Sequence, residues 1–298
     1  MIELKGVKKQ FEDFTALDGV DLTVGSGAAF GLLGSNGAGK STVLRLLSGI
    51  YEADGGTVKI DGENVFDNAE VKRRVFFIND ETVQFGGMSL AEMKKFYSGF
   101  YPNFSAELFD KLNDTIKLPE KKKMDKFSKG MKRQAVVMTG LACRTDYLFL
   151  DEAFDGLDPT MRNIVKRMLV DAMLDRKLTA VISSHNLKEI NEICDSAALM
   201  HKGKVLFCRD LDSLKGSVHK VQAAFGKPCA KEDFEGLEVL HFEQNQSLTY
   251  MIAKGDEAAV SEAVKKKDPK LFDMIPLTLE EIFIYEMEEM GYDFKGIE

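Results

Sequence analysis

Short apolar or alternating stretches, separated by glycine and charged residues, dominate the first 80 positions of the chain. Such stretches are typical of β-strands, and they predict strands at residues 2–7, 20–24, 28–33, 58–60 and 75–78. A glycine-rich loop at 34–40 follows the third of these, and an apolar periodicity at 41–47 indicates a helix after it. The opening therefore predicts a β-rich region that leads into a strand, a loop and a helix.

Helical periodicity is denser between residues 90 and 144, where we expect helices joined by a solvated lysine turn at 121–123. After this region, strands at 147–150 and 179–183 alternate with helices at 159–174 and 187–193. Strands that alternate with helices in this way form a parallel sheet covered by helices. The predicted fold class is therefore α/β.

Charge divides the chain near its last quarter. Residues 1–215 hold 31 acidic and 31 basic side chains, whereas residues 216–298 hold 17 acidic residues against 9 lysines, and so contribute the whole net charge of −8. This second region has strand and helix patterns but no chemical motif. We expect a main domain at 1–215 and a small α+β accessory domain at 216–298.

Composition excludes several classes of protein. No apolar run approaches the roughly 18 residues that a membrane span needs, and no signal peptide is visible at the N-terminus. The chain shows no basic bias, which argues against a nucleic-acid partner. The four cysteines lack the spacing of a zinc site or a disulfide framework, and favour the reducing cytosol: Cys143, Cys194, Cys208 and Cys229.

Residues 34–41 read Gly-Ser-Asn-Gly-Ala-Gly-Lys-Ser, the full phosphate-loop pattern, between a predicted strand and a predicted helix. The glycines let the backbone N–H groups approach phosphate oxygens, and the helix N-terminus adds partial positive charge. We expect Lys40 to contact the β- and γ-phosphates and Ser41 to bind Mg²⁺. The nucleotide-binding residues expected here are Gly34, Ser35, Asn36, Gly37, Ala38, Gly39, Lys40, Ser41 and Thr42.

The apolar run at 147–150 ends in two acids, Asp151 and Glu152. The C-terminal end of a buried parallel strand is where α/β sheets place their ligands. Asp151 would hold Mg²⁺, and Glu152 would orient or polarise the attacking water. Two acids after an apolar run also occur in ordinary charged turns, but their place downstream of a phosphate loop favours the catalytic interpretation.

With its phosphate loop and its pair of acids, the chain resembles the ATP-binding cassette (ABC) ATPases. The other motifs of that family follow in the expected order. Residues 127–131, Phe-Ser-Lys-Gly-Met, occupy the place of the family's signature motif, usually written LSGGQ. Residues 155–158, Asp-Gly-Leu-Asp, resemble the D-loop, and 183–185, Ser-Ser-His, resemble the strand end that holds the switch histidine. The resemblance covers about residues 1–215. It implies a P-loop NTPase core, a β-rich part and a helical subdomain at about 88–144.

The resemblance also implies roles for further residues. Two cassettes would pack head to tail, so that Ser128 and the Gly130 backbone contact the γ-phosphate of the partner chain's ATP. Asp158 would help to set the dimer contact. His185 would reach the γ-phosphate and supplement Lys40 and Mg²⁺. Phe11 resembles the aromatic residue that stacks on adenine, although a core position is the alternative for it.

Two positions depart from the family's pattern. Lys129 and Met131 stand where glycine and glutamine are common, and this variant resembles the form found in some bacterial exporter-type cassettes. The Q-loop position, which is expected to hold a glutamine, holds Asp80. Asp80 could still bind Mg²⁺ through an oxygen, or Gln84 could serve if the loop is longer. Both alternatives stay open.

The resemblance finally implies partners. One cassette per chain requires a second ABC ATPase chain, identical or related, and a separate membrane permease would place the complex at the inner face of the cell membrane. The segment 85–104 is rich in aromatic residues and methionine; it would receive a helix of the permease, or form a local core. Drug or antibiotic export is the substrate class that the resemblance suggests. A soluble non-transport ABC ATPase and a regulatory ATP-binding module are the alternatives.

Overall fold

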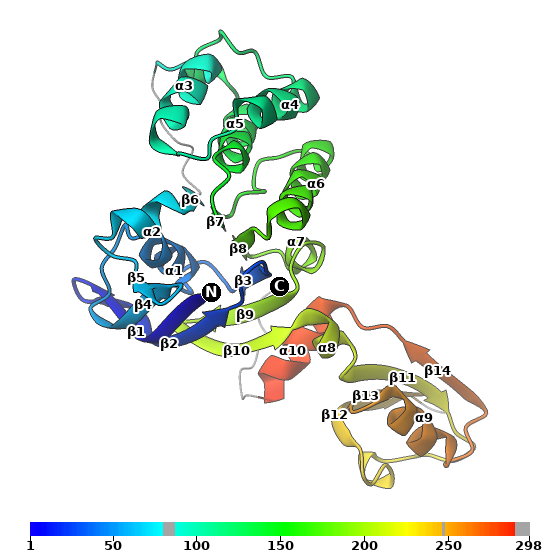
Figure 1. Ribbon diagram of the computed structural model, residues 1–298. Coiled ribbons are helices and arrows are strands. Elements are labelled where there is room, and N and C mark those ends of the chain that lie inside the picture. Colours follow the sequence, from blue (N-terminus) through cyan, green and yellow to red (C-terminus); the bar gives the residue numbers. More distant parts are fainter. Residues whose placement is uncertain (80–86, 246–247, 290–298) are drawn as a thin grey trace. The chain divides into compact units, whose positions relative to one another are not determined.

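The computed structural model describes residues 1–79, 87–245 and 248–289, and the chain divides into two compact units, Met1–Cys208 and Arg209–Glu298 (Figure 1). This division lies seven residues before the boundary at 215/216 that was expected from the sequence. The expected boundary came later because residues 209–215 carry no net charge, so the acidic excess begins only after them. The two units are described separately below.

The first unit contains two sheets. The smaller one has the order β2 (Phe14–Val24), β1 (Ile2–Phe11), β4 (Gly55–Ile60) and β5 (Glu63–Asn64), and its strands pair antiparallel. The larger one has the order β10 (Lys204–Asp210), β9 (Ser196–His201), β3 (Ala29–Leu33), β8 (Thr179–Ser184), β7 (Tyr147–Asp151) and β6 (Val75–Ile78). The pairings among β9, β3, β8, β7 and β6 are parallel. Strands β9 and β10 were not among the strands expected from the sequence.

Helices of the first unit follow the expected order, with one addition, α2, that was not expected from the sequence. They are α1 (Lys40–Leu47), α2 (Ala69–Arg73), α3 (Leu90–Phe100), α4 (Ala106–Ile116), α5 (Lys129–Ala142), α6 (Pro159–Arg176) and α7 (Leu187–Asn191), with a short 3-10 turn at Met124–Lys126. Helices α3, α4 and α5 pack on one another and form the helical region between β6 and β7 (Figure 1).

The N-terminus of α3 is closed by a capping box. The Ser89 side chain accepts from the Glu92 backbone N–H, and the Glu92 carboxylate accepts from the Ser89 backbone N–H at 2.7 Å. The hydrogen bond from the Ser89 backbone, together with Lys123 at 3.0 Å, lowers the pKa of Glu92 to about 2. The helical region therefore begins at a well-defined residue, directly after the segment that links it to β6.

The parallel sheet brings distant motifs to one edge. Strands β3, β7 and β8 are buried along their whole length, as expected for strands covered on both faces. In their register Leu33 pairs with Ser184, and Asp151 pairs with Ser183. Since parallel strands end on the same side, the phosphate loop, the two acids and the strand end before His185 meet there.

The second unit is a four-stranded antiparallel sheet with helices. Its strand order is β12 (Glu238–Asn245), β13 (Leu248–Lys254), β11 (Val218–Ala224) and β14 (Leu271–Ile275). Helix α9 (Glu257–Lys265) buries Val260 and Val264 against one face of this sheet. Helices α8 (Leu211–Lys215) and α10 (Leu279–Glu289) pack on each other, and a 3-10 turn occupies Lys231–Asp233. None of the described helices in either unit is long and apolar enough to cross a membrane.

Candidate functional site

A cavity of about 290 Å³ opens above the phosphate loop, where β3 leads into α1. Its walls combine loop residues with one acid from the end of β7 and two residues of β2. The lining is Phe14, Ala16, Asn36, Gly37, Ala38, Gly39, Lys40, Ser41, Thr42 and Glu152. Seven of the nine phosphate-loop residues expected from the sequence therefore line one cavity, and the other two, Gly34 and Ser35, contact Lys40 through their carbonyls.

Two glycines give the loop its path. Gly34 has a φ of +147°, and a Cβ atom at this position would lie 2.4 Å from the backbone oxygen of Met200. Gly39 has a φ of +106° at the N-cap of α1, where a Cβ atom would lie 2.7 Å from a side-chain carbon of Leu17. Any larger residue would clash with these neighbours in addition to straining the backbone. The loop can therefore wrap closely around a bound group.

The Lys40 ammonium is held inside the loop. Its Nζ atom donates to the carbonyl oxygens of Gly34 at 2.6 Å and Ser35 at 3.3 Å, and it lies 3.4 Å from Oε1 of Glu152. Lys40 is only 5% exposed. A buried cation needs such partners, and a phosphate group would offer it a stronger one than the two carbonyls.

Three oxygen-bearing side chains meet beside the loop. The hydroxyl of Ser41 donates to Oδ1 of the fully buried Asp151 at 3.0 Å, and the hydroxyl of Ser183 donates to the same oxygen at 2.5 Å. Hydroxyl and carboxylate oxygens are the ligands that Mg²⁺ prefers. The donor set of Ser41 and Asp151 therefore fits the expected metal. The sequence had not assigned a role to Ser183, because a serine inside a strand shows no signal until its partner strand is known.

Glu152 is held by two cationic or polar partners. Its carboxylate lies 3.4 Å from Nζ of Lys40 and 3.0 Å from Nδ1 of His185, which comes from the end of β8. Glu152 adopts a positive φ of 45°, an uncommon conformation for a residue with a side chain, and its backbone N–H donates to the Ser183 hydroxyl at 3.1 Å. The turn after β7 thus directs the Glu152 side chain toward the loop.

The same turn brings a third side chain to this point. One carboxylate oxygen of Asp155, one of Glu152 and one ring nitrogen of His185 all lie within 4.8 Å of one another. The sequence placed Asp155 in a D-loop motif without a chemical role. The catalytic candidates Glu152, His185 and Lys40 are therefore neighbours, although 145 positions separate the first and the last of them in the chain.

The expected signature and D-loop residues lie outside the cavity lining. The Ser128 hydroxyl caps α5 by accepting from the Met131 backbone N–H at 3.2 Å, and the Asp158 carboxylate caps α6 by accepting from the Met161 backbone N–H at 3.0 Å. A Cβ atom at Gly130 would lie 3.1 Å from the Gly156 carbonyl oxygen, so the two motifs are in contact within one chain. Asp80 and Gln84, the alternatives at the Q-loop position, fall outside the described residues.

The aromatic ring that lines the cavity belongs to Phe14, whereas the sequence pointed to Phe11. Phe11 packs edge-on against Tyr51, with ring centroids 5.2 Å apart, and does not line the cavity. Phe14, at the start of β2, does line it and is 60% exposed. Phe11 and Phe14 are paired neighbours across the β1–β2 turn. Their positions in the sequence therefore did not show which of the two rings lines the cavity.

We expect Phe14→Ala to weaken ATP binding about 5-fold to 10-fold, since an aromatic stacking contact contributes about 1 kcal/mol. The matched variant Phe11→Ala should change the dissociation constant less than about 2-fold. Titration of each full-length variant with a fluorescent ATP analogue measures both values. The reverse ranking would restore Phe11 as the adenine-stacking residue.

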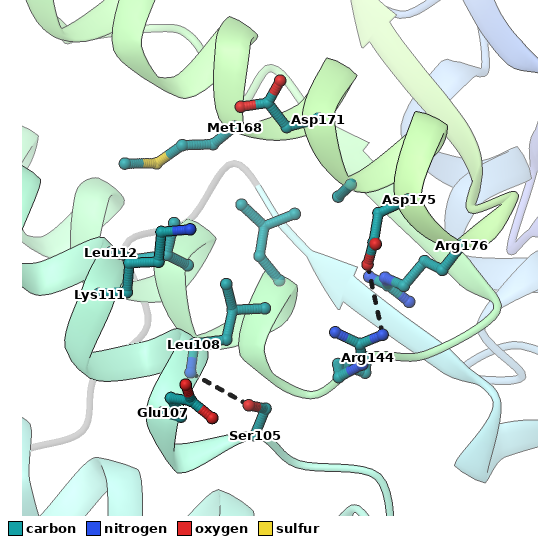
Figure 2. A pocket seen from close by; sticks show the side chains of 12 residues that line it. Ser105, Glu107, Leu108, Lys111, Leu112, Arg144, Met168, Asp171, Asp175 and Arg176 are labelled. Carbon is teal, nitrogen blue, oxygen red and sulfur yellow. Dashed lines mark hydrogen bonds and ion pairs between the residues drawn. The ribbon is translucent and has the colours of Figure 1, made fainter.

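A larger cavity, about 490 Å³, lies between α4, the C-terminal end of α5 and α6 (Figure 2). Leu108 and Lys111 of α4 line one side of it, while an ion pair between Arg144 and Asp175 at 3.4 Å lies on the side of α6. Burial, followed by the charge of Arg144, lowers the pKa of Arg176 to about 10. No phosphate-loop residue lines this cavity, so its greater size does not make it the nucleotide site.

Comparison with known proteins gives consistent matches. The family model described as "ABC transporter" matches residues 17–155. The ABC transporter ATP-binding protein YtrB of Bacillus subtilis is 31% identical over 284 residues, which cover 95% of this chain and 97% of YtrB. The bacitracin transport ATP-binding protein BcrA of Bacillus licheniformis is 30% identical over 218 residues, which cover 72% of this chain and 71% of BcrA. A solved ATP-binding subunit of an ABC transporter superposes with a TM-score of 0.66 at 24% identity, over 72% of this chain and 92% of that one.

Proposed function

Because the chain belongs to the ABC transporter family, as an ATP-binding and ATP-hydrolysing subunit, we propose that it drives export through a separate membrane permease. The observation that supports hydrolysis in this chain is the convergence of Lys40, Glu152 and His185 beside the phosphate loop. Similarity to BcrA, a protein named for bacitracin transport, supports the transport part of this proposal, and the export direction is the proposal's own.

Different residues of the chain have different roles in ATP hydrolysis. The loop backbone and Lys40 hold the triphosphate, and Glu152 orients and polarises the attacking water. His185, which contacts Glu152 at 3.0 Å, keeps that carboxylate in position and would reach the γ-phosphate of a bound nucleotide. Ser41 and Asp151 would hold Mg²⁺, which when bound neutralises phosphate charge.

The position of the signature residues supports a head-to-tail dimer. Ser128, Gly130 and Asp158 lie outside the cavity that the chain forms around its own phosphate loop. This placement fits the proposal that they complete the nucleotide site of another chain. Since each chain holds both halves of the site, two copies of this chain would form two equal sites. The permease would hold this dimer at the inner face of the membrane.

For the permease we propose a contact surface on α3. Within the expected segment 85–104, Leu90 and Met93 are buried, whereas Phe96 is 39% and Phe100 is 63% exposed. The rings of Phe96 and Phe100 pack at a tilt of 43° with centroids 4.7 Å apart and present one apolar surface. Exposed aromatic side chains of this kind are typical anchors of protein interfaces. A cytoplasmic helix of the permease with an apolar face is the occupant that fits them.

We expect the double variant Phe96→Ala/Phe100→Ala to reduce co-purification with a membrane permease encoded by an adjacent gene by at least about 10-fold, because aromatic anchors dominate interface energies. The measurement uses detergent-solubilised membranes from cells that express both chains. The control Lys111→Ala/Asp171→Ala alters the cavity of Figure 2 and should leave co-purification unchanged. Loss of binding in the control alone would move the contact to that cavity, and absence of any membrane-bound fraction would contradict the permease proposal.

A further inference from the structure

The cavity of about 490 Å³ between α4, the end of α5 and α6 has an apolar wall with charged side chains around it (Figure 2). Its size lies within the range of pockets that bind small molecules, about 300–1,000 Å³. All three helices contribute to the apolar wall, which consists of Leu108, Leu112, Leu141, Met168 and Ala172. Three cations and three carboxylates line the rest: Lys111, Arg144 and Arg176, with Glu107, Asp171 and Asp175. A ligand that matches this lining has an apolar body and no net charge.

One arginine of the lining lacks a hydrogen-bond acceptor. Through Nη1, Arg176 at the end of α6 donates to the carbonyl oxygen of Thr145. Its Nη2 atom is buried and has no hydrogen-bond partner among the residues that the structure describes, although buried polar groups are almost always hydrogen-bonded. Burial, followed by the charge of Arg144, lowers the pKa of Arg176 to about 10. A carboxylate beside the two arginines would offset their charge, and a small rotation of the Arg176 guanidinium would give Nη2 an acceptor.

An unpaired acid lies one helical turn from these arginines. Asp175 is paired with Arg144 at 3.4 Å, whereas Asp171 has no ion-pair partner within the described part of the chain. Residues four apart on a helix lie on the same side, about 6 Å from each other. In Figure 2, Asp171 lies above the cavity and both arginines lie near Asp175, lower in the view. The cavity therefore offers an anionic contact and a cationic contact about one helical turn apart.

We propose that this cavity binds a small amphipathic zwitterion, which has an apolar body, an ammonium at one end and a carboxylate at the other. The carboxylate contacts Arg144 and Arg176, the ammonium contacts Asp171, and the apolar body packs on Leu108 and Met168. An extended peptide chain spans about 3.5 Å per residue, so an apolar dipeptide with free ends has the required separation of charges. The site shares no lining residue with the cavity above the phosphate loop, and it depends on neither the dimer nor the permease.

Isothermal titration of the full chain with dileucine, a dipeptide with two free ends, tests this site. We expect saturable binding with a dissociation constant below about 1 mM. N-acetyl-dileucine lacks the ammonium and dileucine amide lacks the carboxylate, so each should bind at least about 10-fold more weakly, since one charged contact is lost. Equal affinity for all three peptides would overturn the zwitterion. Absence of saturable dileucine binding up to about 10 mM would overturn the site itself.

Two substitutions locate each end of the peptide. Arg144→Gln should weaken dileucine binding about 10-fold and leave the binding of dileucine amide unchanged, because the amide makes no contact with the arginines. Asp171→Asn should weaken dileucine binding by a similar factor and leave that of the N-acetyl form unchanged. The matched controls are Arg167→Gln on α6 and Asp114→Asn on α4, which make the same changes at exposed positions outside the cavity. Both controls should stay within about 2-fold of the parent.

ATP binding separates this site from the nucleotide site. Arg144→Gln and Asp171→Asn should bind ATP as the parent does, which also shows that both variants are folded. Lys40→Met, which alters the phosphate loop, should bind dileucine with the affinity of the parent. Loss of dileucine binding in Lys40→Met would place the peptide in the nucleotide cavity and overturn the proposal. Parental dileucine affinity in both Arg144→Gln and Asp171→Asn would place the peptide outside the cavity of Figure 2, which overturns it as well.

Discussion

Glu152→Gln should lower the ATPase turnover number by at least about 100-fold and leave ATP bound. A carboxylate that orients and polarises water contributes roughly 10²-fold to 10⁴-fold to such reactions, and an amide of the same shape cannot accept the proton. The substitution also removes the attraction between the carboxylate and Lys40 at 3.4 Å, so the ammonium becomes more available to the γ-phosphate. We therefore expect ATP to be held longer and the ATP-bound dimer to accumulate.

Steady-state ATPase assays and sedimentation of the full chain with ATP measure both effects. The matched control is Glu192→Gln, which changes an exposed acid paired with Lys166. This control should stay within about 2-fold of the parent, because the Glu192 carboxylate is exposed and does not line the cavity above the phosphate loop. Turnover in Glu152→Gln equal to that of the parent would remove Glu152 from the reaction.

Lys40→Met should raise the dissociation constant for ATP about 100-fold, equivalent to ~2.7 kcal/mol. Hydrogen bonds from a charged donor contribute roughly 1.5–3 kcal/mol each, and Lys40 is expected to make more than one with the phosphates. The buried ammonium is held by carbonyls at 2.6 and 3.3 Å without nucleotide. Its removal therefore weakens phosphate binding without leaving a water-filled cavity in the core, since methionine retains most of the apolar stem.

Isothermal titration of the full chain with ATP measures the loss, and a thermal melt without nucleotide checks the fold. The control Lys188→Met removes an exposed lysine at the start of α7 and should not change affinity. Unaltered ATP affinity in Lys40→Met would contradict the assignment of the phosphate loop. A lower melting point together with unaltered affinity would assign Lys40 a structural role.

The similarity to YtrB extends beyond the ATP-binding cassette into the second unit. The alignment with YtrB covers 95% of the chain and therefore reaches into this unit, whereas the alignment with BcrA covers 72%. Its sheet buries one face under α9, and Lys220 of β11 forms an ion pair with Glu281 of α10 at 2.9 Å. The sequence alone predicted strands and helices here, but no chemistry.

Much of the fold and of the nucleotide site could be predicted from local patterns. The loop at 34–41 is one continuous segment, and the two acids at the end of β7 are adjacent residues. Each motif follows or ends a short apolar strand, so a local pattern is enough to find it. The apolar runs of β3, β7 and β8 are typical of strands covered on both faces. Strand β10 was missed because it is mixed in polarity and its pairing with a neighbour decides its conformation. Strand β9 was missed as well, although its buried run Ala-Ala-Leu-Met is apolar.

The contacts between distant residues depended on the tertiary structure. Glu152 meets His185 because β7 and β8 are parallel neighbours that end together, and no local pattern states which strands pair. Phe14 rather than Phe11 reaches the cavity because the β1–β2 turn orients the two rings differently. Lys129 departs from the family's motif in sequence, and only the fold places its stem on Gly156. The sequence by itself determined which chemical groups the site contains, whereas the packing of strands and turns decided which of them meet.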